Sequence, residues 1–96
     1  MQKLILSLTI AAVALIAAPG AARAQEALAK SSGCLNCHAV DTKKAGPSFK
    51  DISAKYKGKA DAAATLEANL TSGKGHPAVK ASAADVKSLV KWILSM

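Results

Sequence analysis

Residues 31–40 of this 96-residue chain have the sequence SSGCLNCHAV, and this stretch decides how the rest of the chain is interpreted. Cys34 and Cys37 are separated by two residues, and His38 follows the second cysteine directly. Cysteines at this spacing occur in redox dithiols, in structural disulfides, in zinc sites and in covalent haem attachment sites. The remainder of the sequence has to discriminate between these four uses.

Three of the four uses find little support elsewhere in the chain. A thioredoxin-like dithiol belongs to a βαβ setting, and this sequence has no strand-like alternation. A disulfide across so small a ring restricts the unfolded chain little, and a tetrahedral zinc site would have only His76 as its fourth ligand. Cys-x-x-Cys-His is instead typical of c-type haem attachment. We therefore predict one haem c, bound through thioethers to Cys34 and Cys37 and through iron to His38, with the dithiol and the zinc site as alternatives.

The first 24 residues have the three-part pattern of a secretory signal peptide. Lys3 gives a positive start, residues 4–18 are an almost unbroken apolar run, and Ala22 and Ala24 are the small residues of a cleavage site. The run is shorter than the roughly 20 apolar residues of a membrane-spanning helix. We expect cleavage after Ala24, export to the periplasm without stable membrane insertion, and one mature domain of residues 25–96.

Composition limits what this domain is able to bury. Cleavage after residue 24 of 96 leaves 72 residues, with one Phe, one Tyr, one Trp and many alanines. A core with so few large apolar side chains usually needs a covalent cross-link, a metal or a cofactor.

Loss of Lys3 and Arg23 lowers the formal charge from +7 to +5. The lysines are not interleaved with aromatics, which argues against nucleic acid and leaves either acidic protein partners or simple solubility.

Apolar spacing predicts helices and no strands. The segments expected to be helical are 26–32, ended by Gly33; 49–56, capped by Ser48; 62–70, capped by Asp61; and a terminal helix behind the capping-box-like residues 82–85. The segments 39–49 and 71–81, rich in Gly, Pro and polar residues, are expected to contain loops. The predicted fold class is all-α, with three to four short helices and long loops around the haem.

Two stretches, GCLNCHAVDTKKAGPSFKDI (33–52) and ADVKSLVKWILS (84–95), carry a resemblance over the whole mature chain. The chain resembles class I c-type cytochromes of the small single-haem bacterial type, which feed electrons to periplasmic oxidoreductases such as nitrite reductases. The resemblance implies that Pro47 offers its carbonyl oxygen to Nδ1–H of His38, which orients the imidazole. It also implies that the terminal helix, near Trp92, packs on the N-terminal helix beside Gly33.

The sequence departs from this family at the distal ligand. Where the family has a methionine followed by proline, this chain has His76 and Pro77, in a shorter loop that lacks the usual tryptophan. Gly75 permits unusual backbone angles and Pro77 stiffens the turn. We therefore expect His76 to be the second axial ligand rather than a loop histidine without a role.

Other donors are weaker candidates for the iron. Met96 ends a helix whose apolar face is already committed to packing, and its neighbouring carboxylate resists burial. Lys74 or Lys80 would have to lose its proton and its hydration, which costs free energy near neutral pH. A five-coordinate iron is the remaining alternative.

These features predict a periplasmic electron carrier with a low-spin bis-histidine iron and a lowered reduction potential. The alternative is a haem-based sensor that binds NO or CO when His76 is displaced. We expect no enzyme activity, because no carboxylate pair or arginine is placed to handle a substrate. The expected partners are acidic redox proteins, and the expected state is a monomer. The lysines proposed for docking are Lys43, Lys44, Lys50, Lys74 and Lys80.

Overall fold

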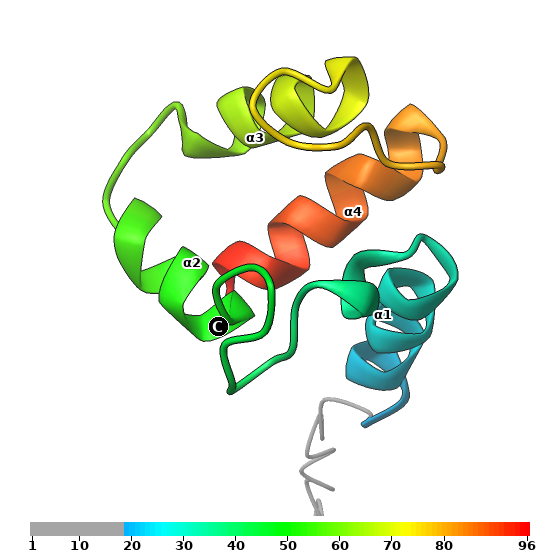
Figure 1. Ribbon diagram of the computed structural model, residues 1–96. Coiled ribbons are helices and arrows are strands. Elements are labelled where there is room, and N and C mark those ends of the chain that lie inside the picture. The colour runs from blue at the N-terminus through cyan, green and yellow to red at the C-terminus, as the bar shows by residue number, and fades with distance from the viewer. Residues whose placement is uncertain (1–18) are drawn as a thin grey trace, which may run out of the picture.

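The computed structural model describes residues 19–96, and all regular structure in this range is helical. The elements are α1 (Pro19–Ser31), the short 3-10 helix η1 (Cys34–Asn36), α2 (Phe49–Tyr56), α3 (Ala62–Ser72) and α4 (Ala83–Leu94), as Figure 1 shows. The all-α prediction is confirmed for this part of the chain. Most of the predicted signal peptide lies outside the described residues.

Helix α1 differs from its prediction at the N-terminal end. It begins at Pro19 rather than near Glu26, and it therefore runs through the predicted cleavage site after Ala24. Proline is favoured at the first position of a helix, because its missing N–H is not needed there. The helix ends at Ser31, just before Gly33 as predicted.

Two serines begin helices as predicted. The hydroxyl of Ser48 accepts a hydrogen bond from the backbone N–H of Asp51 at 3.1 Å, and Ser82 accepts one from Asp85 at 3.2 Å. Both serines have extended backbone angles, which is the usual N-cap geometry. Each cap satisfies an N–H group that has no partner within its own helix. The bounds of α2 and α4 follow directly from these two caps.

Helix α3 begins where it was expected but for a different reason. Asp61 occupies the N-cap position, yet its side chain makes no capping hydrogen bond and its backbone is helical, with φ −95° and ψ 0°. The predicted side-chain cap is therefore wrong. The helix also continues two residues past Leu70, to Ser72. Gly73, with φ +77°, ends it in the left-handed conformation common at helix C-termini.

Helix α4 lies at the centre of the described fold and packs against α1, α2 and α3 (Figure 1). Its buried side chains recur at helical spacing and are Val86, Leu89, Val90 and Ile93. Ala29 of α1 is fully buried beside this face, and its small side chain allows α1 to approach closely. Phe49, the first residue of α2, joins the same cluster and meets the Trp92 ring edge-on at 5.6 Å.

A buried serine joins the end of α4 to α2. The Ser53 hydroxyl lies 3.1 Å from the carbonyl oxygen of Leu94 and 2.8 Å from that of Met96. The last carbonyls of a helix have no partner within the helix, so a donor at this position stabilises its end. Ser53 is only 6% exposed, which makes loss of its hydroxyl costly.

We predict that Ser53→Ala lowers the free energy of unfolding by about 1–2 kcal/mol, because two partly buried backbone oxygens at the end of α4 lose their donor. Urea titration of the haem-loaded protein, followed by circular dichroism, measures this loss. Ser95→Ala is the matched control, since the exposed Ser95 hydroxyl bonds only to Trp92 within the same helix. Equal losses in the two variants would contradict the role given to Ser53.

Candidate functional site

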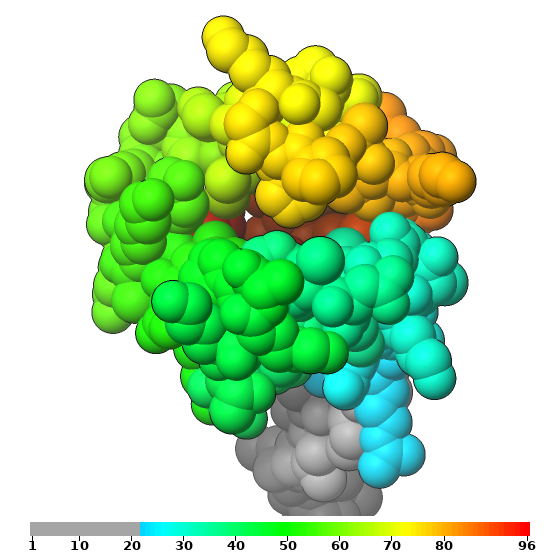
Figure 2. Space-filling model, viewed as in Figure 1, coloured from blue at the N-terminus to red at the C-terminus, as the bar shows by residue number. Residues whose placement is uncertain are grey.

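A mostly apolar cavity of about 370 Å³ lies between the Cys-x-x-Cys-His segment, α2, α3, α4 and the loop after α3. Figure 2 shows its mouth as a slit between the green and yellow segments, with the red part of the chain visible in its depth. Its volume is typical of a cofactor site. All five predicted site residues line this cavity: Cys34, Cys37, His38, Pro47 and His76. The structure therefore brings together side chains that are up to 42 positions apart in the sequence.

The two cysteines are held by the turn η1. The backbone N–H of Cys37 and that of His38 both donate to the carbonyl oxygen of Cys34, at 3.2 and 3.0 Å. This turn places both thiols and the imidazole at the wall of one cavity. The cysteines are not joined in a disulfide, and burial raises the pKa of the Cys34 thiol. Redox-active cysteines usually have a lowered thiol pKa, and burial shifts the pKa of Cys34 in the opposite direction.

The ring of His38 is oriented by the backbone of the following loop. Its Nδ1 lies 2.6 Å from the carbonyl oxygen of Pro47, so Nδ1–H donates and Nε2 is left with a lone pair. Metal-binding histidines usually show this arrangement, in which a carbonyl fixes the tautomer and the ring orientation. The Phe49 ring stacks near the imidazole, with centroids 5.5 Å apart. The Pro47 contact implied by the family resemblance is thus present.

Gly46 makes this orientation sterically achievable. A Cβ at this position would collide with Cε1 of His38 and would lie only 2.8 Å from Nδ1. The Gly46 backbone N–H also donates to the carbonyl oxygen of Cys37 at 2.7 Å, which ties the loop to the cysteine turn. Only glycine satisfies both constraints. The sequence analysis had assigned Gly46 to a loop and had given it no role of its own.

His76 reaches the same cavity from the loop after α3. Its Nδ1 lies 2.7 Å from the carbonyl oxygen of Pro77, so this ring too retains Nε2 as a free acceptor when Nδ1 is protonated. Gly75 has φ +71°, a left-handed conformation that glycine adopts at no steric cost. The N–H of Val79 donates to the carbonyl oxygen of Leu70 at 2.9 Å and anchors the loop on α3.

The two imidazoles are spaced for a single metal ion. The ring centroids of His38 and His76 are 6.1 Å apart, and the ring planes differ by 6°. A metal–imidazole bond is about 2.0–2.1 Å long, so two such bonds and two ring radii together span roughly 6 Å. The residues present therefore fit an iron held between two histidines. They also fit a flat apolar group around it, because the cavity walls are mostly apolar.

The rival donors lie elsewhere. Met96 packs against the hydrophobic cluster of Ala29, Phe49, Leu89 and Ile93 and is not among the residues that line the cavity. Lys74 and Lys80 are exposed and do not line it either. Within residues 19–96, no group of three or more His, Cys, Asp or Glu side chains is arranged to hold a metal ion by itself. The described residues thus offer no tetrahedral zinc site.

Sequence reasoning missed the polar residues at the other side of the cavity. Lys55, Tyr56 and Asn69 line it. The ammonium groups of Lys55 and Lys59 lie 5.4 and 5.5 Å from the centroid of the Tyr56 ring, within the range of a cation–π contact. The signal was present in the sequence KYKGK at 55–59, where three lysines surround one aromatic residue.

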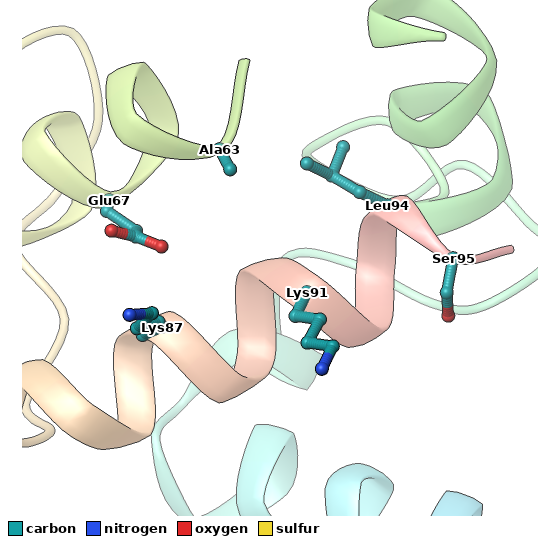
Figure 3. A pocket seen from close by; sticks show the side chains of 6 residues that line it. All are labelled: Ala63, Glu67, Lys87, Lys91, Leu94 and Ser95. Carbon is teal, nitrogen blue, oxygen red and sulfur yellow. The ribbon is translucent and has the colours of Figure 1, made fainter. Parts of the chain in front are cut away.

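A second hollow, of about 460 Å³, lies between α3 and α4 and is open to the surface. Figure 3 shows the six residues that line it: Ala63, Glu67, Lys87, Lys91, Leu94 and Ser95. None of them lines the first cavity, and the set contains no histidine or cysteine. The chemistry predicted from the sequence therefore belongs to the first cavity alone.

Comparisons with known proteins agree on one family. Residues 21–96 match the family model described as Cytochrome c. The chain is 44% identical to "Cytochrome c-552" of Nitrosomonas europaea and 38% identical to "Cytochrome c-551" of Pseudomonas aeruginosa, and each alignment covers 92% of both chains.

Solved structures give the same result. The class 1 cytochrome MtoD of Sideroxydans lithotrophicus superposes with a TM-score of 0.68 at 42% identity, over 76% of this chain and 92% of that one. Wild-type cytochrome c552 of Nitrosomonas europaea superposes with a TM-score of 0.64 at 42% identity, over 73% and 96%.

We predict that Gly46→Ala displaces the His38 ring, because the new methyl group would lie too close to Cε1 and Nδ1 of the imidazole. The expected result is partial or complete loss of the low-spin absorption and EPR signals of the oxidised, haem-loaded protein. Ala45→Ser, at the exposed neighbouring position, is the control and should leave these spectra unchanged. A normal low-spin spectrum of Gly46→Ala would refute the steric argument.

Proposed function

The chain belongs to the cytochrome c family, and we propose that it is a periplasmic carrier of single electrons whose iron is bound by His38 and His76. Its relatives are small bacterial class I c-type cytochromes, which contain covalently attached haem c and exchange electrons with redox partner proteins. The same cofactor and the same general function apply to this chain. The axial ligands, the cellular location and the nature of the partners are the proposed part.

Each of the predicted residues has a defined role in this proposal. Cys34 and Cys37 form the two thioethers, and His38 binds the iron on the proximal side. Pro47 keeps the His38 ring in place through the hydrogen bond to Nδ1. His76 binds from the distal side. The bound haem supplies an Fe(III)/Fe(II) couple that takes up and releases one electron at a time.

The single observation that carries the distal assignment is the paired geometry of the two imidazoles. Both rings line one cavity, their centroids are 6.1 Å apart, and each uses Nδ1 on a proline carbonyl. The Nδ1 contact of His76 with the Pro77 carbonyl oxygen has the same form as the contact that orients His38, and metal-binding histidines usually have such a contact. The cavity-lining residues also lack a methionine.

This ligand set supports electron transfer rather than ligand capture. With both imidazoles bound to the iron, no position would be left open for a small molecule. The hydrogen bond from the Val79 N–H to the Leu70 carbonyl oxygen and the contact within the His76–Pro77 turn hold the His76 ring at the cavity wall. Nothing among the described residues favours the sensor alternative.

The comparisons support export and cleavage near residue 24. The match to the family model begins at residue 21. The two solved relatives align over 92% and 96% of their own chains but over only 76% and 73% of this one. About a quarter of this chain, close to the length of the predicted signal peptide, therefore lies outside the alignment with each solved relative. Cleavage after Ala24 would leave residues 25–96 as the mature cytochrome.

The surface beside the cavity suits an acidic partner, although the lysines concerned are not among the five predicted from the sequence. Lys44 donates to the carbonyl oxygen of Leu35 at 2.9 Å, and Lys50 pairs with Asp41. The α2 lysine cluster, which we define as Lys55, Lys57 and Lys59, is exposed and forms no salt bridge with any described residue.

The α2 lysine cluster adjoins the cofactor directly, because Lys55 itself lines the cavity. Tyr56 extends from the same segment into the cavity wall, so a partner docked here would lie close to the haem. Positive charge at this point would accelerate encounter with an acidic redox protein and would make the rate depend on salt. Such encounters need only a small interface.

We predict that His76→Met raises the reduction potential by roughly 0.1 V or more, because thioether ligation favours Fe(II) and axial ligands tune haem potentials over about 0.8 V. Spectroelectrochemical titration of the matured protein measures the shift. An unchanged potential would contradict His76 as a ligand.

A second variant separates electron transfer from small-molecule binding. His76→Gly should open the distal position, so that the reduced variant binds CO rapidly while the reduced parent protein does not. The absorption spectrum reports this binding directly. Rapid CO binding by the parent protein would instead favour the sensor alternative.

We predict that removing the α2 lysine cluster (K55A/K57A/K59A) slows electron transfer with hexacyanoferrate, an anionic redox probe, several-fold at low salt and flattens its salt dependence. The control K30A/K87A/K91A removes the same charge from exposed positions on α1 and α4 that do not line the cavity. Equal effects in the two variants would show that net charge alone matters.

A further inference from the structure

The side chain of Gln25 has a buried oxygen atom without a hydrogen-bond partner among the described residues, and Gln25 directly follows the predicted cleavage site. The residue lies within α1, and the atom is its Oε1. It is the only buried side-chain N or O atom of the described chain in this condition. A buried acceptor without a donor is unfavourable, so this amide is not stabilised where it lies. Cleavage after Ala24 would make the same residue the N-terminus of the mature protein.

We propose that the mature protein carries an N-terminal pyroglutamate formed from Gln25. This proposal rests on the export and cleavage proposed above, and not on the ligands of the iron. The uncharged α-amino nitrogen attacks Cδ of its own side chain, and a new N–Cδ bond closes a five-membered lactam. The Cδ–Nε2 bond breaks, and Nε2 leaves as ammonia with the proton that the amine gives up. No oxidant, reductant or cofactor is required.

The protonation state of the new amine permits this reaction. An α-amino group has a pKa of about 7.7–8.0, so a useful fraction is uncharged and nucleophilic near neutral pH. The following residues Glu26 and Ala27 are exposed, so the structure leaves space around the new terminus for ring closure. The side-chain amide is not engaged in a hydrogen bond through its oxygen that would have to be broken first.

The fold also gives the product an electrostatic advantage over the starting material. Cleavage inside α1 leaves a helix that starts at the new terminus, and the N-terminal end of a helix carries partial positive charge. A protonated amine would add a full positive charge at this end, whereas the lactam carries none. Ala29 and Leu28, which pack in the core, anchor the following turn and keep the helix in place.

Intact-mass spectrometry of the haem-loaded protein, purified from the periplasm of an expressing bacterium, tests this proposal. The expected mass is that of residues 25–96 with haem, reduced by one molecule of ammonia, and the N-terminus should resist Edman degradation. Gln25→Asn is the matched control. It retains the amide, but its side chain is one methylene shorter, so closure would need a strained four-membered ring. This variant should show the full mass and a free amine.

Two outcomes would overturn the proposal. Wild-type protein that retains the full mass and a free amine after prolonged incubation at neutral pH would exclude cyclisation. A mature chain that begins at another residue would also exclude it, and would correct the cleavage site. The absorption spectrum of the same sample separates these results from the electron-transfer proposal, since a low-spin bis-histidine spectrum does not depend on residue 25.

Discussion

The hydrogen bond between Nδ1 of His38 and the Pro47 carbonyl oxygen is the interaction on which the rest of the site depends. It directs Nε2 of His38 toward a metal, and it requires the loop after the cysteine turn to lie against the ring. That approach in turn requires Gly46, because any Cβ there would overlap the imidazole. This single contact therefore explains why the loop contains Gly46 and Pro47 and why it passes so close to the His38 ring.

The distal side repeats this arrangement within a smaller segment. His76 uses the carbonyl oxygen of its own neighbour, Pro77, so the orienting contact needs no second loop. The loop can therefore be short, with Gly75 supplying the turn and Val79 anchoring it to α3. In a small chain with few bulky side chains, the cofactor supplies apolar surface that the alanines do not.

The sequence correctly predicted those structural features that depend on interactions between residues close together in the chain. Ser48 and Ser82 are caps because a hydroxyl three residues before an N–H reaches it, and the buried face of α4 follows from its periodicity. The grouping of Cys34, Cys37 and His38 likewise follows from their motif, whereas the contact of Pro47 with His38 was implied by the family resemblance. The role of Asp61 was predicted wrongly because its backbone adopts a helical rather than a capping conformation, which composition alone does not specify. The bonds of Lys44 and Lys50, and the position of Lys55 at the cavity, depend on contacts between segments.

The central position of α4 bears on the order in which the protein matures. This helix packs against each of the other three, yet it comes last in chain order among the described helices. During synthesis the cysteine motif would therefore be present before α4 is. Val90 and Ile93 of α4 form part of the wall of the cavity that holds both thiols, so this cavity would remain incomplete, and the thiols accessible for haem attachment, until α4 has joined the fold.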